Sequence, residues 1–290
     1  MRIIEMTIEG KSRTDEFYIY PIGDTHVGKI NCHESGIKKV VREVESRDNA
    51  LWFGGGDYCD CIKPQDAKRF SPDTLPNWLL TGNPDTIREN LSDIVSKQAH
   101  RFTRFVEPIK DKCIGMISGN HEATMLKSYN YDVHKTLCAW LGVQDLTDTF
   151  FMRLRFKRSQ SGGVKTITLF ATHGSGGGRT PGAEPNHLAR LIQDKDADIL
   201  FRGHSHTQCI PTETPMLYIP HNGKLPVREC RQKLKYSANW GAYVKTYAVG
   251  PPTYDSRAQY PARALKTCYA KIRPFVNANE PEIEILPFNL

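Results

Sequence analysis

The chain has 290 residues, 39% of them hydrophobic and 24% charged, and this composition excludes a disordered or fibrous protein. No apolar run reaches the length of a membrane span, and the first residues lack the continuous apolar stretch of a signal peptide. We therefore expect a cytoplasmic protein without a membrane partner. Lys and Arg outnumber Asp and Glu by 39 to 32, and the resulting charge of +7 is compatible with a polyanionic partner such as nucleic acid.

The eight cysteines favour reduced thiols over a disulfide framework, because the chain is long and carries no export signal. Several of them, such as Cys113, lie in apolar segments, where a free thiol packs like a small apolar side chain. Cys59 and Cys61 form a C-x-C pair with no second pair nearby, so a structural zinc site is not expected.

Extended and helical patterns alternate along the first half of the chain. Apolar segments at 16–22, 50–54 and 112–117 predict strands, each followed by glycine and polar side chains. Apolar residues at helical spacing predict a helix over 36–48, and further helices are expected over 86–106 and 131–141. The segment 62–85 is long for a connection, and it either caps a site or forms an interface.

In the second half, residues 150–158 and 164–174 alternate polar and apolar side chains and predict a hairpin across the turn SQSGG. A helix at 186–193 precedes an apolar segment at 197–206, and short strands are expected at 216–220, 242–250, 267–275 and 282–288. Alternating strands and helices followed by antiparallel strands indicate a layered α/β architecture with mixed sheets. We expect a single domain over 1–290, with an insert at 62–85 and a β-rich portion at 207–290.

Five of the predicted strands end in side chains that bind metals. Their sequences are GDTH at 23–26, GDYCD at 56–60, GNHE at 119–122, HG at 173–174 and GHSH at 203–206. Loops at the carboxyl ends of strands gather at one edge of an open α/β sheet, so these five can converge. Asp24 and His26 are two residues apart, as are His204 and His206, and such pairs project to the same side of an extended chain.

The order D-x-H, G-D-x-x-D, G-N-H-E, a single His and G-H-x-H resembles the signature of the calcineurin-like metallophosphoesterases. It stands here at residues 24–26, 56–60, 119–122, 173 and 203–206, so the likeness spans residues 23–206. In overall character the chain is similar to small phosphoesterases of phage and prophage genomes. It bears a more distant resemblance to nucleases of the Mre11 and SbcD type.

This resemblance implies a four-layer α/β/β/α sandwich with two mixed sheets and a site for two divalent metal ions. Seven residues would hold the metals, and Asp57 would bridge both. The set for the first metal is Asp24, His26, Asp57 and His206. The set for the second metal is Asp57, Asn120, His173 and His204.

The same resemblance assigns catalysis to His121, as general acid or phosphate contact, with Asp60 as its orienting carboxylate. Two cations about 3.5 to 4 Å apart offset the charge of a phosphate ester and can bridge an activated hydroxide that attacks it. Mixed imidazole, carboxylate and amide ligands suit manganese, with iron, zinc and cobalt as alternatives.

Two further segments each have two interpretations. The loop GSGGGRT at 174–180 is either a phosphate cradle, in which Arg179 binds the substrate, or a loop beside the site. In the segment 228–247, basic residues are interleaved with aromatic ones, which fits both nucleic-acid stacking and a half-exposed strand.

The sequence therefore predicts a metal-dependent hydrolase that acts on phosphodiester bonds. Its expected partner is a phosphate-ester substrate. If that substrate is a nucleic acid, the enzyme is a DNA or RNA nuclease. A phosphomonoesterase, or a cyclic-nucleotide or protein phosphatase with the same metals, is the alternative. A non-catalytic binding protein is disfavoured because the ligand set is complete and both His121 and Asp60 are present.

Overall fold

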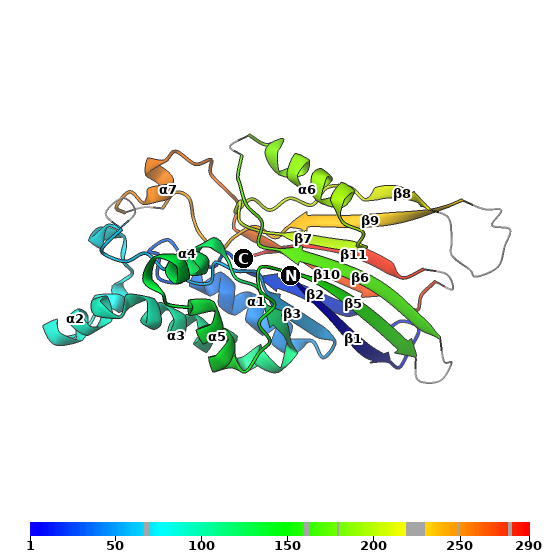
Figure 1. Cartoon of the computed structure of the whole chain (residues 1–290), viewed down its shortest axis with the longest axis horizontal. Helices are drawn as coiled ribbons and strands as arrows, with labels where there is room; N and C mark the ends of the chain where they lie inside the picture. The colour runs from blue at the N-terminus through cyan, green and yellow to red at the C-terminus, as the bar shows by residue number, and fades with distance from the viewer. Residues whose placement is uncertain (67–69, 159–162, 179, 219–229, 249, 278–279) are drawn as a thin grey trace.

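A computed structural model describes residues 1–66, 70–158, 163–178, 180–218, 230–248, 250–277 and 280–290. Its longer strands form two sheets (Figure 1). The six-stranded sheet has the order β1-β5-β6-β7-β9-β8, and the five-stranded sheet has the order β11-β10-β2-β3-β4. The strands are β1 Arg2–Gly10, β2 Phe17–Ile22, β3 Ala50–Gly54, β4 Cys113–Met116, β5 Thr149–Arg158, β6 Val164–Thr172, β7 Ile199–Arg202, β8 Thr214–Tyr218, β9 Arg231–Asn239, β10 Lys266–Arg273 and β11 Glu282–Asn289.

Helices cover the outer faces of both sheets. The α-helices are α1 Glu34–Ser46, α2 Pro84–Ser92, α3 Ile94–Val106, α4 Asn120–Tyr129, α5 Val133–Leu141, α6 Ala183–Asp194 and α7 Tyr254–Arg257. The described residues also form short 3-10 helices, η1 Pro72–Thr74, η2 Asn77–Leu79 and η3 Glu107–Lys112. None of the described helices is long and apolar enough to cross a membrane.

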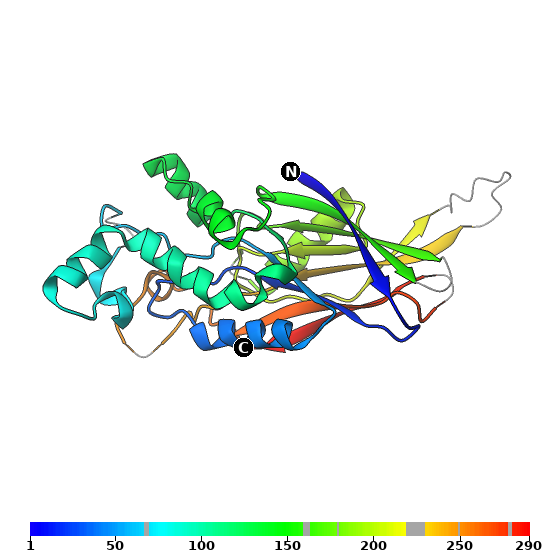
Figure 2. The same ribbon diagram turned by 90° about the horizontal axis from the view of Figure 1, so that it is seen from below.

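The core is divided among three interfaces between these layers. Side chains from β2, β3, β5, β6 and β10, among them Phe53 and Phe150, pack between the two sheets. Residues of α1, α3 and α5, such as Val40 and Phe102, pack against the other face of the five-stranded sheet. The helix α6 packs on the six-stranded sheet through Ile192, on the opposite side of the molecule (Figures 1 and 2). The order is α/β/β/α with two mixed sheets, which confirms the predicted fold class.

The topology brings the predicted strand ends to one edge. The strands β2, β3 and β4 are parallel to one another, and so are β6 and β7 in the other sheet. The loops after β2 and β3 are joined by hydrogen bonds from the backbone N–H groups of Asp24, His26 and Val27 to carbonyls of residues 56–58. The loops after β2 and β3 are therefore held together at the point where these two strands end.

Several predicted elements differ in the structure. The helix expected over 86–106 is broken at Asp93, whose backbone (φ −119°, ψ 38°) leaves the helical region, so α2 and α3 are separate. The segment 119–122 was expected as a loop, but Asn120 and His121 open the helix α4. The strand β1 has no counterpart in the prediction. Its residues Ile4, Met6 and Ile8 alternate with polar ones and pack, half-buried, against the core between the sheets.

The strand predicted over 242–250 is wrong for its described residues. Gly241, with φ +87°, turns the chain after β9, and a side chain there would collide with the carbonyl oxygen of Lys266. The backbone of Tyr243 then bonds to the loops beside β2, donating to Asp24 and accepting from His33. These residues support the site instead of extending the sheet.

The segment 62–85 packs on the helical layer in its described part. Leu75 and Leu79 are buried in the core against α1 and α3. The guanidinium of Arg101 lies 4.7 Å from the ring of Trp78. These contacts fix the insert to the chain's own helices, and its role as a cap of the site or as an interface stays a prediction.

Candidate metal centre

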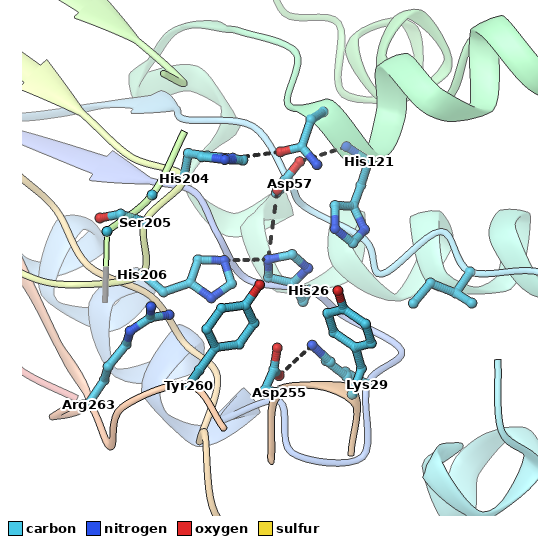
Figure 3. Close-up of a pocket in the computed structure, with 15 residues that line it drawn as sticks. His26, Lys29, Asp57, His121, His204, Ser205, His206, Asp255, Tyr260 and Arg263 are labelled. Atoms are coloured by element: carbon cyan, nitrogen blue, oxygen red, sulfur yellow. Dashed lines mark hydrogen bonds and ion pairs between the residues drawn. The ribbon is translucent and has the colours of Figure 1, made fainter. Parts of the chain in front are cut away.

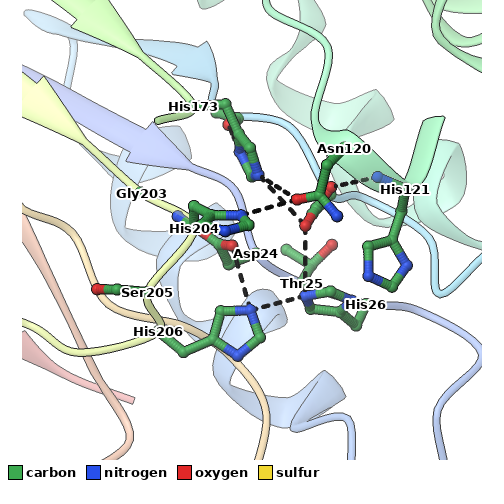
Figure 4. A network of polar contacts seen from close by, with 12 residues as sticks. Asp24, Thr25, His26, Asn120, His121, His173, Gly203, His204, Ser205 and His206 are labelled. Atoms are coloured by element: carbon green, nitrogen blue, oxygen red, sulfur yellow. Dashed lines mark hydrogen bonds and ion pairs between the residues drawn. The ribbon is translucent and has the colours of Figure 1, made fainter. Parts of the chain in front are cut away.

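Five chain segments carry the predicted site residues into one cluster (Figure 4). Each segment, four loops and the first turn of α4, follows the carboxyl end of a different strand. The contributions are Asp24 and His26 after β2, Asp57 and Asp60 after β3, Asn120 and His121 after β4, His173 after β6, and His204 and His206 after β7. The carboxylate and imidazole residues form three overlapping groups, and within each group the potential ligand atoms lie within 4.8 Å of one another. The groups are Asp24, His26, Asp57 and His206; His26, Asp60 and His121; and Asp57, His173 and His204.

Asp57 belongs to two of these groups. Its Oδ2 lies 3.2 Å from Nε2 of His173 and 3.8 Å from Nε2 of His26. Its Oδ1 accepts a hydrogen bond of 2.9 Å from the backbone N–H of His121. The carboxylate therefore lies between the two histidines, and the residues on either side form separate clusters that share it.

The first cluster joins the loops after β2 and β7. Nε2 of His26 and Nε2 of His206 are 2.9 Å apart, and the latter lies 3.3 Å from Oδ1 of Asp24. The other oxygen of Asp24 accepts hydrogen bonds from Nε1 of Trp240 (2.8 Å) and the backbone N–H of His204 (3.1 Å). These two donors orient the carboxylate so that Oδ1 faces the histidines.

The second cluster is built around Asn120. Its Oδ1 lies 3.2 Å from Nε2 of His173 and 2.8 Å from Nδ1 of His204. Nδ1 of His173 is 2.8 Å from the carbonyl oxygen of Gly55, which can only accept, so Nδ1 carries the proton and Nε2 faces the cluster.

The backbone of the site is strained at several of the predicted metal ligands. Five of the predicted ligands have a positive φ, a conformation uncommon for residues other than glycine. They are Asp24 (52°), His26 (44°), Asp57 (52°), His204 (71°) and His206 (59°). Such strain persists where the surrounding structure enforces it, and it gathers at functional sites.

Glu122 enforces part of this geometry. Its carboxylate, in the first turn of α4, accepts hydrogen bonds from the backbone N–H groups of Asp57 (2.9 Å), Tyr58 (2.8 Å) and Gly119 (3.0 Å). Gly119 is required beside it, because a Cβ there would lie 2.1 Å from Oδ1 of Asp57. The glycine thus allows α4 to begin directly against the shared carboxylate.

The donor atoms of the cluster fit divalent metal ions. Oδ1 of Asp24, the oxygen that faces the histidines, is buried without a hydrogen-bond partner among the described residues. Burial lowers the pKa of His26 to about 4, so its ring is neutral, the form that binds metals. Burial also lowers the pKa of His173, but the carboxylates of Asp57 and Asp24 raise it to about 10 overall. The extra proton on this imidazole balances the negative charge of the two carboxylates, and a bound cation would balance the same charge in its place.

Comparison with known proteins agrees with this arrangement. The family model of the calcineurin-like phosphoesterases matches residues 17–208, which include all five segments. The chain belongs to the calcineurin-like phosphoesterase family. No curated protein matches the chain.

Solved structures similar to this calcineurin-like phosphoesterase are distant. Wild-type Vps29 of Entamoeba histolytica, complexed with zinc, is 13% identical, with a TM-score of 0.36 and coverage of 94% of this chain and 100% of that one. The calcineurin-like phosphoesterase YfkN of Bacillus subtilis is 10% identical, with a TM-score of 0.41 and coverage of 93% and 90%. The NAD nucleotidase NadN of Haemophilus influenzae is 12% identical, with a TM-score of 0.43 and coverage of 95% and 50%. With every TM-score below 0.5, none of these likenesses carries an argument about activity.

The predicted pair of catalytic residues in this phosphoesterase is arranged differently from the expectation. Nδ1 of His121 lies 2.5 Å from the backbone carbonyl oxygen of Asp60 and forms its hydrogen bond there, and not with the Asp60 carboxylate. Oδ1 of Asp60 instead lies 3.7 Å from Nδ1 of His26. Asp60 thus orients His121 through its main chain, while its carboxylate faces a predicted metal ligand. Arg179, the predicted substrate-binding residue, lies outside the described residues.

The aromatic residues of the segment 228–247 differ in exposure: Tyr247 is 53% exposed and Tyr236 is half-buried, whereas the other two lie in the core. Trp240 and Tyr243 are fully buried. Lys235 is buried as well, and its Nζ donates to the carbonyl oxygen of Lys195. Residues 231–239 form the half-exposed strand β9, and Trp240 serves the site from inside the core. Binding of nucleic acid by the exposed residues of this segment stays a prediction.

A cavity of about 450 Å³ opens beside the cluster. His26, Asp57 and His206 lie on one side of it, and Tyr260 and Arg263 on another (Figure 3). The last two residues were missed by the sequence analysis, because they follow the last motif by more than fifty positions and carry no motif of their own.

Proposed function

We propose that this chain is a phosphodiesterase that depends on two divalent cations. The observation that carries the proposal is the position of Asp57, whose Oδ2 lies between His26 and His173 at 3.8 Å and 3.2 Å. A carboxylate shared by two clusters of imidazole, carboxylate and amide ligands is suited to bridging a pair of metal ions.

The proposed ligands divide between two positions. The first position would be held by Asp24, His26, Asp57 and His206, and the second by Asp57, Asn120, His173 and His204. Manganese is the proposed metal, since a mixture of imidazole nitrogen with carboxylate and amide oxygen suits it, as it also suits iron, zinc and cobalt.

Bound cations would supply Lewis-acid charge that offsets the negative phosphate and lowers the pKa of a water molecule. The residues of the chain supply orientation and a proton. His121 donates from Nδ1 to the carbonyl of Asp60, so Nε2 is the ring nitrogen left to act on the substrate. In its imidazolium form His121 delivers a proton from Nε2 to the leaving oxygen.

A diester is proposed over a monoester because the cavity extends beyond the metal-binding residues. Its far side, with Tyr260 and Arg263, gives a second ester substituent a place to lie. A nucleic-acid strand is one possible source of such a diester. The likeness to phosphoesterases of phage genomes and the cytoplasmic location stay predictions.

The test is hydrolysis by the purified protein of p-nitrophenyl phosphate, bis-p-nitrophenyl phosphate and labelled single- and double-stranded DNA, with Mn²⁺ and with chelator. We expect manganese-dependent cleavage of the small diester at a higher kcat/KM than that of the monoester. Cleavage that survives the chelator, or that is confined to the monoester, contradicts the proposal. The DNA arms decide whether the enzyme is also a nuclease.

A further inference from the structure

A short segment between β9 and β10 forms one wall of the cavity. Tyr254, Tyr260 and Arg263 line the same cavity as His26 and His206. Figure 3 shows Tyr260 and Arg263 pointing toward these two histidines. We call residues 253–263 the C-terminal wall. A substrate whose phosphate lies at the metal-binding residues must meet this wall.

The C-terminal wall is anchored next to the cluster by a buried ion pair. Nζ of Lys29 lies 2.7 Å from Oδ2 of Asp255, and the two side chains are only 10% and 12% exposed. Lys29 follows His26 by three residues, so the anchor begins in the loop that carries a predicted ligand. The side chain of Thr253 caps the following turn by accepting from the N–H of Ser256. The wall is therefore held at a fixed place relative to the cluster.

Arg263 brings a positive charge into the cavity, and no described carboxylate forms an ion pair with it. No Asp or Glu among the described residues lies within ion-pair distance of its guanidinium, and its buried Nε has no hydrogen-bond partner there. Its near neighbour is the ring of Tyr260, 5.6 Å from the guanidinium carbon. A partly buried cation without a partner is costly, and an anionic ligand in the cavity would satisfy it. The guanidinium is well suited to phosphate because its donors match two oxygens at once.

Two tyrosine rings lie near the guanidinium of Arg263. The rings of Tyr254 and Tyr260 are 6.3 Å apart between centroids and tilted by 60°. Flat side chains at the edge of a phosphate site are the groups on which nucleobases stack. The cavity volume of about 450 Å³ falls in the usual range for small-ligand sites, about 300 to 1,000 Å³.

We propose that Arg263 and Tyr260 form a nucleotide subsite, in which Arg263 binds a non-bridging phosphate oxygen and Tyr260 packs against the base. This inference rests on the proposed phosphodiesterase function and gives its substrate class. The substrate is a phosphodiester that places one nucleotide unit in the cavity. A small nucleotide diester and the end of a nucleic-acid strand share that chemistry.

Binding is the first test, because it needs no turnover. Isothermal titration of the manganese-loaded protein with thymidine 5′-monophosphate and with inorganic phosphate separates the two contacts. Arg263→Ala is expected to weaken binding of both by at least about 10-fold, the loss of a charged hydrogen bond. Tyr260→Leu is expected to weaken only the nucleotide, by about 5- to 100-fold. Arg257→Ala is the matched control, since Arg257 is exposed in the same segment and does not line the cavity.

Hydrolysis is the second test. Thymidine 5′-(p-nitrophenyl phosphate) and methyl p-nitrophenyl phosphate share a leaving group, so their kcat/KM ratio reports the subsite. We expect the wild type to prefer the nucleotide, Tyr260→Leu to lose that preference, and Arg263→Ala to lose rate on both. Release of a nucleotide from a dinucleotide, or from the end of a labelled oligonucleotide, identifies the source.

The subsite is contradicted if both variants bind thymidine 5′-monophosphate as the wild type does, whatever the hydrolysis result. It is also contradicted if the wild type prefers the methyl diester. Nucleotide binding that depends on Arg263, together with no hydrolysis of any ester, supports the subsite and contradicts the phosphodiesterase function instead. The two proposals therefore fail separately.

Discussion

His121 occupies the position of a proton donor without being one of the proposed metal ligands. It lies in the first turn of α4, with its ring fixed at Nδ1 by the carbonyl of Asp60. We expect His121→Ala to lower kcat by about 10²- to 10⁴-fold, the usual contribution of a general acid, while metal content stays near that of the wild type. The measurements are steady-state kinetics and elemental analysis of the same samples.

The matched control for that variant is His100→Ala, because His100 is exposed on α3 and stacks on Trp140 away from the cluster. It should leave kcat unchanged. Full activity in His121→Ala would remove the histidine from the reaction.

Trp240 shows that a buried aromatic residue can act on the site through one hydrogen bond. Its Nε1 donates to Oδ2 of Asp24 at 2.8 Å, which leaves Oδ1 facing the histidines. Trp240→Phe keeps most of the ring volume and removes the donor. We expect the metal affinity of the protein to fall by about 10- to 100-fold, since partners that orient a ligand have effects of this size.

Trp52→Phe is the control for the loss of an indole donor. Nε1 of Trp52 donates to the carbonyl of Ile109 at 2.7 Å, in the core beneath the helices. Its removal should lower the free energy of unfolding by about 1 kcal/mol and leave metal affinity unchanged. Equal metal affinities for Trp240→Phe and the wild type would contradict the orienting role of Trp240.

At the scale of elements, α4 and the loop after β3 are joined through Glu122. The carboxylate accepts from four buried backbone N–H groups, three of them in that loop. Glu122→Ala leaves these donors without partners, so we expect a loss of about 3 kcal/mol in the free energy of unfolding, together with reduced metal retention. Chemical denaturation and metal analysis measure the two effects.

Asp85→Ala provides the comparison for Glu122→Ala. Asp85 also lies in the first turn of a helix, α2, but its side chain is 88% exposed. Its substitution should change the free energy of unfolding by less than about 0.5 kcal/mol. If the two variants are equally stable, Glu122 does not hold the loop.

The strand ends could be predicted from the sequence because each combines an apolar run, a glycine and a ligand-type side chain within a few residues. The same local rule could not locate Trp240 or Arg263. Trp240 reaches Asp24 only because β9 pairs with β7 and the chain then turns at Gly241. Arg263 reaches the cavity because a buried ion pair draws its segment toward Lys29. Both depend on tertiary contacts, which short sequence patterns do not contain.

The helix boundaries show the same division between local and tertiary information. The helix α1 follows from its apolar spacing and agrees with the prediction to within two residues at each end. The beginning of α4 at Asn120 was missed, because GNHE was interpreted as a loop. Glu122 three residues after Gly119 is a capping pattern that could have revealed it.

At the scale of the whole molecule, the two sheets must stay aligned for the five segments to meet. Phe53 lies between the sheets, with ring centroids 5.4 Å from Phe150, 5.8 Å from Phe201 and 6.0 Å from Trp240. We expect Phe53→Ala to lower the free energy of unfolding by about 3 to 5 kcal/mol through the cavity it leaves. Denaturant titration gives this value.

Leu126→Ala is the control, since Leu126 is 46% exposed on α4 and should change the free energy of unfolding by less than about 1 kcal/mol. Phe53→Ala should also weaken metal binding, because Trp240 loses a packing partner. Normal stability of Phe53→Ala would contradict a packed interface between the sheets.

The central claim is that Asp57 bridges two metal positions, and the most direct test is the number of metal ions per chain. Elemental analysis after loading with Mn²⁺ and removal of excess metal should give about two ions per chain for the wild type, because each cluster supplies one position. Asp57→Ala should retain almost none, since both positions lose the shared carboxylate. A variant that keeps one or two tightly bound ions, or a wild type that binds a single ion, would contradict the bridged site.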